Sequence, residues 1–377
     1  MSAGSYIELR SHRADFQAAL ARISEGAPER DAGPRFPEGP FRELAALGVT
    51  AFPAPDDNGN NRRASFTEEW RVLRAVSKTD SSVGRILDGH LNGVERLSVL
   101  LPEPLRSREL EAVAAGELLL GVWGADPIPG EGTPARLVRD GDDTFIEGVK
   151  TYCSGSTGLD RALVAVRPPE GGPPGPPLLA YVDLAGGLEI DRSWYKGSGM
   201  RASESHRVIF HRAPVLAVLG GPGELIREPY FSRDAIRTAV CWVGIADRAV
   251  EATLEILAAK AAATGGEPDD LVSLAAGRIK TAQTTMDRWL EYAGHRADDD
   301  PAASLASFSI HLRESVAKAC REILDEAARA LGSHPFATAG DLDRARRDLE
   351  LFMLQHRLEP ALARAGRREI LDRGGSL

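Results

Sequence analysis

The hydrophobic period of this 377-residue chain changes twice, and this change constrains its fold more than any other feature. Up to about residue 116, apolar residues recur every three or four positions, as on one face of a helix. Between residues 118 and 210, short alternating runs stand between Gly- and Pro-rich turns, a pattern typical of strands. From about residue 230 the helical period returns. The sequence therefore predicts an α+β protein rather than a single helical bundle.

Three domains follow from this order. We expect an N-terminal α-helical domain over residues 1–116, a middle β domain over 117–216 and a C-terminal helical bundle over 217–377. The turn spacing of the middle domain fits a small barrel or sandwich. The last domain contains segments with the length and Ala/Leu content of a four-helix bundle: 234–263, 269–294, 302–332 and 342–366.

Two local signals refine the first domain. Ser65, followed three positions later by Glu68, predicts a capping box at the start of a helix. The next helical segment contains Gly84, Gly89 and Gly93. Because each glycine costs a helix interior about 1 kcal/mol, we expect this helix to lie close against another element.

The overall composition narrows the classes of function. A net charge of -9 without a basic cluster argues against binding to nucleic acid. Cys153, Cys241 and Cys320 are far apart, which predicts neither a disulfide framework nor a metal site and fits a reducing cytoplasm. There is no signal-peptide pattern and no apolar run of roughly 20 residues, so we expect a cytoplasmic protein without a membrane partner.

The stretch from Gly148 to Asp160 stands out in the middle domain. It follows the turn-rich residues 140–143 and precedes the alternating run 162–166, so we predict a β-hairpin segment. Tyr152, Cys153 and Ser154 directly precede a glycine there. Small polar groups and open backbone suit the close approach of a flat ligand, whose identity these residues leave open.

Several motifs resemble those of the acyl-CoA dehydrogenase superfamily of flavoenzymes, over nearly the whole chain. The most specific covers residues 199–205, which are similar to the family's Gly-Met-Arg-x-Ser-x-Ser. Residues 148–155 resemble its Gly-x-Lys-x-Trp-Ile-Thr-Asn strand, and Arg347 with Asp348 resembles its Arg-Asp pair. The resemblance implies a flavin cofactor, FAD by default, and a homodimer or homotetramer. It also implies a small-molecule substrate, an acyl-CoA or related thioester that undergoes α,β-dehydrogenation.

The resemblance also assigns residues to the cofactor. Ser154 matches the family's hydroxyl residue at flavin N5, where we expect it to donate a hydrogen bond, and Tyr152 matches the aromatic residue over a ring face. The alternative for Ser154 is a hydrogen-bonded serine of an ordinary hairpin. Cys153 lies between them. Trp123 would pack on the flavin or fill the barrel mouth, and Ala125 replaces a threonine of the following turn.

The family's usual base is a glutamate eight positions after the aspartate of the Arg-Asp pair, and here that position holds His356. An imidazole, with an ordinary pKa of about 6.5, can act as a base near neutral pH. Glu359 is the fallback if the register differs. His90 resembles a histidine that lines the substrate cavity in the family's monooxygenase branch. The alternatives are a surface residue for His356 and a packed helix residue for His90.

Departures from the family pattern leave the cofactor and the reaction open. Ala262 stands where a diphosphate-binding arginine is usual, although Lys260 is near, and Glu131 stands in place of a serine. A carboxylate repels a diphosphate, so either the AMP half of FAD is held differently or the cofactor is FMN. The histidines favour a reduced-flavin monooxygenase on the same fold as the second hypothesis. A flavin-free scaffold that has lost its activity is the third.

Overall fold

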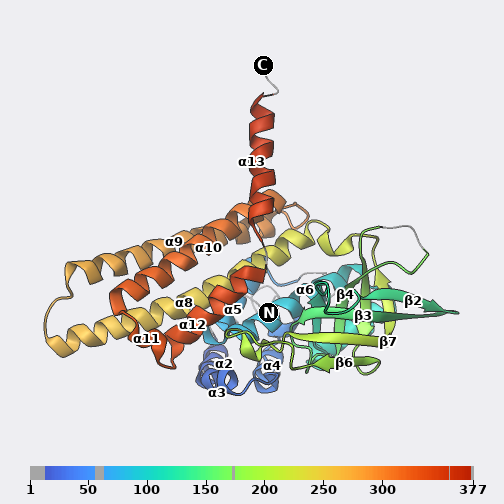
Figure 1. Cartoon of the computed structure of the whole chain (residues 1–377), viewed down its shortest axis with the longest axis horizontal. Helices are drawn as coiled ribbons and strands as arrows, with labels where there is room; N and C mark the ends of the chain where they lie inside the picture. The colour runs from blue at the N-terminus through green and yellow to red at the C-terminus, as the bar shows by residue number, and fades with distance from the viewer. Residues whose placement is uncertain (1–12, 56–62, 172–174, 356, 375–377) are drawn as a thin grey trace, which may run out of the picture.

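The structure, a computed structural model, describes residues 13–55, 63–171, 175–355 and 357–374. The predicted order of helices, strands and helices is confirmed (Figure 1). The first part contains a short 3-10 turn, η2 (Val49–Ala51), and these helices: α2 (Ala14–Glu25), α3 (Ala27–Ala32), α4 (Glu38–Ala46), α5 (Phe66–Thr79), α6 (Ser81–Leu100) and α7 (Leu105–Ala115).

Side-chain caps fix the starts of α5 and α6. The hydroxyl of Ser65 accepts a hydrogen bond from the backbone N–H of Glu68 at 3.1 Å, which confirms the capping residue predicted for α5. Asp80 caps α6 in the same way, because its carboxylate accepts from the N–H groups of Ser82 at 2.9 Å and Val83 at 3.1 Å.

Helix α6 lies directly against its neighbours, as its glycines predicted. A Cβ atom on Gly93 would lie 2.4 Å from Leu120 Cδ1 in strand β1, and one on Gly84 would lie 2.2 Å from Ser77 Oγ in α5. Contacts this short leave no room for a side chain. The helix therefore packs tightly between the sheet and α5 and sets the distance between them.

The middle region forms a seven-stranded sheet in the order β1-β4-β5-β7-β3-β2, with β6 paired to β7. Strand β7 pairs with β3 and β6 through its first half and with β5 through its second half. The strands are β1 (Leu120–Trp123), β2 (Arg136–Asp140), β3 (Asp143–Cys153), β4 (Arg161–Val166), β5 (Leu178–Asp183), β6 (Leu188–Asp191) and β7 (His206–Leu219).

The hairpin expected around Gly148 is only partly correct. Strand β3 does form a hairpin with β2 across residues 140–143. The next strand, β4, pairs instead with β1 and β5. The reason is Asp160, whose carboxylate accepts from the N–H of Leu119 at 2.8 Å while its own N–H donates to Leu119 O at 2.9 Å. These bonds draw the chain after Ser154 across to β1.

The C-terminal part departs from the prediction in its last helix. Helices α8 (Tyr230–Thr264), α9 (Asp270–Asp299) and α10 (Ala306–Leu331) run side by side, with α12 (Asp341–Phe352) along α8 and the short α11 (His334–Ala337) before it (Figure 1). The segment predicted as one helix over 342–366 is two helices, because α12 is followed by η5 (Met353–Gln355) and then α13 (Glu359–Gly374). Pro360, which lacks an N–H, suits the first turn of α13 and would break a continuous helix.

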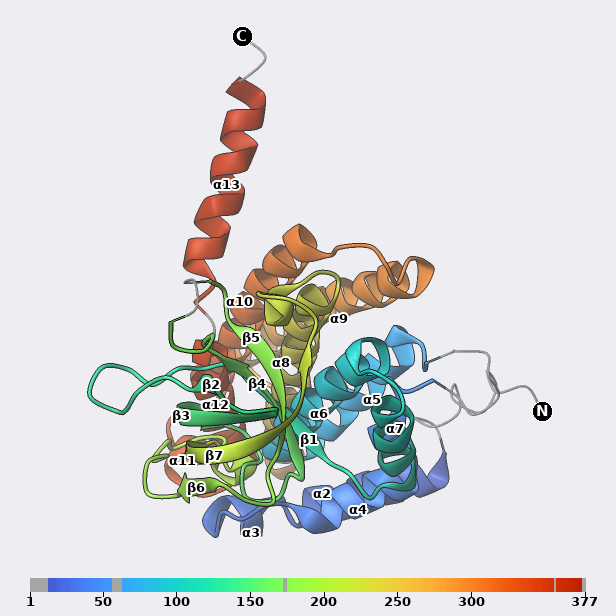
Figure 2. The same cartoon turned by 90° about the vertical axis from the view of Figure 1, so that its right-hand side faces the viewer.

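Helix α13 stands away from the rest of the molecule, as Figures 1 and 2 show from two directions. Most of the other helices and the sheet share one large apolar core, which includes Trp70, Trp123 and Trp242, and a second, smaller core lies between α6, α7 and the sheet. Within the described ranges, no helix combines the length and the apolar character needed to cross a membrane. The domain boundaries at 116/117 and 216/217 stay predictions.

Candidate functional site

Strand β3 ends in a bulge that gives its last residues different environments. Its pairing with β7 shifts register between Lys150 and Cys153, and Tyr152 adopts a left-handed backbone with φ 53°. Tyr152 is consequently 58% exposed, whereas Cys153 is buried. Burial raises the pKa of the Cys153 thiol, so it is a packing residue with no reactive thiolate. Strained left-handed residues of this kind often mark functional sites.

Three serines form a hydrogen-bonded chain beside this bulge. Ser154 Oγ lies 2.9 Å from Ser205 Oγ, which lies 2.8 Å from Ser203 Oγ. Ser203 donates to the carbonyl of Met200 at 2.6 Å. A carbonyl only accepts, so the single proton of Ser203 is used there, Ser205 must donate to Ser203, and Ser154 must donate to Ser205. The half-buried Ser154 oxygen therefore offers lone pairs to a further partner, in contrast to the donor role expected for it.

Lys150 fixes the turn that faces the end of β3. Its buried ammonium donates to Gly124 O at 2.9 Å, to Ala165 O at 2.7 Å and to the Asp126 carboxylate at 2.9 Å. Burial lowers the pKa of Lys150, and the bond to Asp126 opposes this shift. All three donors of the ammonium group are thus used.

Trp123 and Ala125, the other two predicted cofactor residues, differ in exposure. Trp123 is buried, with its ring centroid 6.4 Å from that of Phe210 and its indole N–H donating to Ser154 O at 3.1 Å. Its ring is enclosed by its neighbours, and its role at the cofactor stays a prediction. Ala125 is exposed, and its carbonyl accepts from the N–H of Thr151 at 3.1 Å. The turn at Ala125 is thereby held beside Tyr152.

The aspartate of the Arg-Asp pair supports the loop that carries the serine chain. The buried Asp348 carboxylate accepts from the backbone N–H of Met200 at 2.5 Å and from the Ser81 hydroxyl. Burial raises the pKa of Asp348 to about 6, against the effect of these two hydrogen bonds. One side chain in α12 thus connects α6 to the loop before β7.

The arginine of the same pair closes the contact between α12 and the loop. Arg347 Nη1 donates to the carbonyl of Ser198 at 2.5 Å, and its guanidinium also pairs with Asp31 at 2.7 Å. A Cβ on Gly199 would lie 2.1 Å from the carbonyl oxygen of Arg347, so only glycine fits. Two motifs that are far apart in the sequence therefore form one interface.

His90 is held on both sides by the backbone. Its Nε2 lies 2.9 Å from the carbonyl of Thr50, and its Nδ1 accepts from the N–H of Leu120 at 3.2 Å. Burial lowers the pKa of His90 to about 4, so the ring is neutral near pH 7. With both ring nitrogens engaged, the geometry favours the packed helix residue over a proton donor to a substrate.

His356, the predicted base, lies outside the described residues. The segment before it approaches the loop of the serine chain, because a Cβ on Gly197 would lie 2.9 Å from Leu351 Cδ2. Glu359, the fallback base, is exposed at the start of α13.

The residues expected near a diphosphate are divided between the end of α8 and the bulge of β3. Lys260 and Ala262 are exposed in the last turns of α8. Glu131 has a partner, because its carboxylate accepts from the indole N–H of Trp194 at 3.0 Å. The Trp194 ring stands edge-on to Tyr152, with centroids 4.8 Å apart. Glu131 therefore orients an aromatic pair at the bulge.

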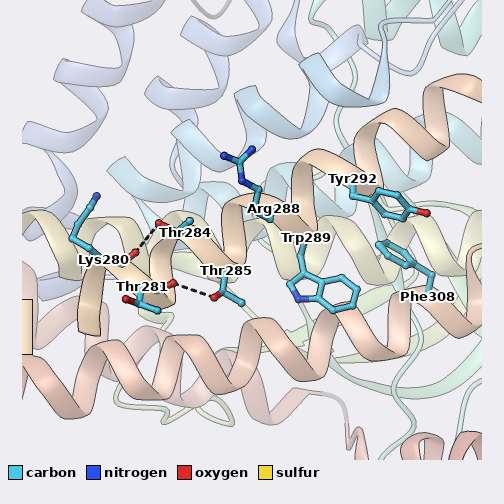
Figure 3. Close-up of a pocket in the computed structure, with 8 residues that line it drawn as sticks. All are labelled: Lys280, Thr281, Thr284, Thr285, Arg288, Trp289, Tyr292 and Phe308. Carbon is cyan, nitrogen blue, oxygen red and sulfur yellow. Dashed lines mark hydrogen bonds between the residues drawn. The ribbon is translucent and has the colours of Figure 1, made fainter. Parts of the chain in front are cut away.

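A separate cleft of about 830 Å³ lies on α9 and α10. Figure 3 shows three aromatic side chains gathered at one end of it, Trp289, Tyr292 and Phe308, with the threonines of α9 further along. None of the predicted site residues lines this cleft. Its lining residues are Lys280, Thr281, Thr284, Thr285, Arg288, Trp289, Tyr292 and Phe308.

Sequence reasoning assigned no role to Ser203, Ser205 or Trp194. The first two lie within the motif at residues 199–205, but Ser203 ends a 3-10 turn and Glu204 is left-handed, so no strand period in the sequence would place their side chains together. Trp194 lies in an irregular turn between β6 and β7, where no periodic pattern exists to indicate its direction.

Comparison with known proteins gives a sequence relative and several structural neighbours. No model of a known protein family matches the chain. A probable acyl-CoA dehydrogenase, YngJ of Bacillus subtilis (strain 168), is 25% identical over 280 residues, which cover 71% of this chain and 72% of that protein. FMN-bound TdsC of Paenibacillus sp. A11-2 superimposes with a TM-score of 0.81 at 16% identity over 96% of both chains. Nitrososynthase of Micromonospora carbonacea var. africana gives a TM-score of 0.78 at 22% identity, over 93% of this chain and 92% of that one.

Proposed function

We propose that this chain, which has the fold of the acyl-CoA dehydrogenase superfamily, is a flavin-dependent oxidoreductase that uses reduced flavin as a monooxygenase. The observation that carries the proposal is the direction of the serine chain. N5 of oxidised flavin accepts a hydrogen bond, whereas N5 of reduced flavin bears a hydrogen and donates. Because Ser154 donates to Ser205, its oxygen is an acceptor and matches the reduced form.

The residues around the bulge suit a flat cofactor. The exposed Tyr152 and the half-buried Trp194 form an aromatic pair that would pack on the ring system, and the backbone at Ala125 lies beside Tyr152. Bound reduced flavin would supply the electrons that activate oxygen for insertion into a substrate. Glu131 and Ala262 offer nothing to a second phosphate, which favours FMN over FAD.

His356 is assigned to proton transfer, on its position eight residues after Asp348. An imidazole titrates near neutral pH and can both give and accept a proton during oxygen insertion. Support for this reaction class comes from the FMN-bound structural neighbour, TdsC, which is a dibenzothiophene monooxygenase.

The second candidate function is α,β-dehydrogenation of an acyl-CoA or related thioester. The similarity to a probable acyl-CoA dehydrogenase favours it. In that case His356 or Glu359 would remove the α proton, and an oxidised flavin would need a hydrogen-bond donor at N5. The serine chain does not provide that donor through Ser154 unless its hydroxyls reorient.

The test compares the two oxidation states of the cofactor. Under anaerobic conditions, we expect the full-length protein to bind reduced FMN about tenfold more tightly than oxidised FMN, as one added hydrogen bond allows. With a reductase that supplies reduced FMN, oxygen uptake should exceed that of the reductase alone. Equal affinities, together with bleaching of the flavin band by an acyl-CoA without oxygen, would instead establish the dehydrogenase. Protein that takes up neither FMN nor FAD would be the flavin-free scaffold.

A further inference from the structure

Arg313 of α10 has an unusual combination of burial and unused hydrogen-bond donors. It is 8% exposed, and its guanidinium lies 5.2 Å from the ring centroid of Trp242. Among the described residues, neither its Nε nor its Nη2 has a hydrogen-bond partner. Burial lowers the pKa of Arg313 to about 10, which still leaves it protonated at neutral pH. A buried cation of this kind is costly unless an anion meets it.

The two unused atoms form the edge of a guanidinium that grips a carboxylate. Arg74 shows this geometry in the same molecule, since its Nε and Nη2 donate to the two oxygens of Asp247 at 2.6 and 2.9 Å. Arg237, which is also buried, is paired with Glu69 at 2.6 Å and Glu95 at 2.7 Å. Elsewhere, then, the fold supplies carboxylates to its buried arginines, and Arg313 is an exception among the described residues.

The carboxylate that attracts Arg313 is already hydrogen-bonded to another arginine. Asp88 attracts Arg313, but its fully buried carboxylate accepts a hydrogen bond from Arg85 at 2.7 Å. Arg85 lies 5.6 Å from the ring centroid of Phe352, which stands edge-on to Trp242 at 6.3 Å. Asp88 also attracts Arg237, so Arg313 shares this carboxylate with two other arginines. We call these five residues, Arg85, Asp88, Trp242, Arg313 and Phe352, the Arg313 cluster.

We propose that the Arg313 cluster binds a carboxylate of the substrate, side-on through Nε and Nη2 of Arg313, with Trp242 and Phe352 against the apolar part of the molecule. The inference rests on the proposed function for its location, because Phe352 ends α12 only four residues before His356. It adds the class of substrate: a compound with a free carboxylate attached to an apolar or aromatic body.

The test needs neither the true substrate nor the flavin. Benzoate and benzamide are nearly the same in shape, and only benzoate is an anion. We expect calorimetry on the flavin-free full-length protein to show benzoate binding about tenfold more tightly than benzamide. In Arg313→Gln the two affinities should fall within about twofold of each other, and in Arg313→Lys the preference should be reduced, because a lysine keeps the charge but not the fork.

A matched control keeps the result specific. Arg288→Gln removes an arginine from the exposed face of α9, where among the described residues it bonds only a carboxylate on its own helix, and should leave the benzoate preference unchanged. Thermal unfolding adds a second readout: benzoate should raise the Tm of wild type and of Arg288→Gln but not that of Arg313→Gln.

Three outcomes would overturn the inference. They are equal affinities in wild type, a preference that survives in Arg313→Gln, and no benzoate binding up to its solubility limit. The last, with a Tm that falls in Arg313→Gln, would mean that Arg313 only packs on Trp242. FMN titrations of the same samples separate this inference from the proposed function. If the protein prefers reduced FMN but does not prefer benzoate to benzamide, only the inference about Arg313 is wrong. If it prefers benzoate but does not prefer reduced FMN, only the proposed function is wrong.

Discussion

Ser154 receives its hydrogen-bond polarity from a residue 51 positions further along the chain. The hydroxyl by itself is both donor and acceptor, and the carbonyl of Met200 decides between the two roles through Ser203 and Ser205. Residues that would not touch the cofactor thus decide whether Ser154, which would touch it, acts there as a donor or as an acceptor.

Replacing Ser205 with alanine interrupts the hydrogen-bonded serine chain. The proton of Ser154 then becomes available to an outside acceptor, so we expect the preference for reduced over oxidised FMN to fall about tenfold, the value of one hydrogen bond. Anaerobic titration with both forms of FMN measures it. Ser193→Ala, on an exposed turn, is the control that should behave as wild type. If Ser205→Ala keeps the wild-type preference for reduced over oxidised FMN, the serine chain does not act on the flavin.

For His356 we expect a separation of binding from turnover. His356→Ala should retain FMN and lose most oxygen-dependent product formation, because only the proton-transfer group is removed. His356→Glu should restore acyl-CoA oxidation only if the protein is a dehydrogenase. Near-normal turnover of the alanine variant would place the proton-transfer group elsewhere.

Asp348 should make stability depend on pH in an unusual direction. Its pKa is raised in the folded state to about 6, so the folded chain holds this proton more strongly than the unfolded chain does. The stability it contributes is complete below about pH 4 and is lost as the pH rises through about 6. Asp348→Asn should therefore gain on the order of 2 kcal/mol relative to wild type between about pH 4.5 and 6.5. Urea unfolding at both pH values measures this gain, and a constant difference would contradict it.

The contrast between Ser154 and its neighbours shows what a sequence can predict about such a site. A motif located Ser154 and Tyr152, because residue types at fixed spacing are visible in one dimension. The direction of the serine chain and the burial of His90 depend on the carbonyls of Met200 and Thr50, which a linear pattern does not relate to them. Arg313 likewise has no local signal, since what distinguishes it is the lack of a described partner in space.

At the scale of elements, α6 is the support on which the site is built. Its Gly93 lets it approach β1, and that approach brings Ile86 of the same helix against the turn at Gly155, directly after Ser154. The helix was predictable from its period and its glycines. Strand β2 was not, because three of its five residues are charged, and β6 was not, because its alternation spans only four residues.

Gly93→Val tests this approach. Its Cβ would stand 2.4 Å from Leu120 Cδ1, and overpacking of this kind costs about 1–3 kcal/mol. We expect a lower midpoint in urea and weaker binding of FMN. Gly277→Ala, at an open position of α9, is the matched control and should stabilise the protein by up to about 1 kcal/mol. If both variants unfold at the wild-type midpoint, α6 is not in close contact with the sheet.

At the scale of the whole molecule, α13 is notable because most of it projects away from the other helices and the sheet. It spans 16 residues, projects from the body in both views, and exposes Ile370 and Leu371 (Figures 1 and 2). An isolated helix of this length is marginal in water, so a second copy of the chain is the partner that we expect to cover it. The predicted homodimer or homotetramer gives it that partner.

Ending the chain after residue 358 tests this role of α13. Light scattering should report a dimer or tetramer for the full chain and a smaller assembly for the shortened one, because the shortened chain lacks the helix that bridges copies. A shortened variant with far-UV circular dichroism like the full chain, apart from the lost helix, excludes misfolding as the cause. A full chain that is a monomer, or an unchanged mass after shortening, would contradict the prediction.

The contact of Asp348 with Met200 also has a consequence for how the protein is made. Chains leave the ribosome from the N-terminus, so the sheet and the serine chain emerge first. The carboxylate that fixes the Met200 loop follows 148 residues later. Throughout that interval of synthesis the loop lacks its support from α12, and any ribosome-bound nascent chain that stops short of α12 should be unable to retain the cofactor.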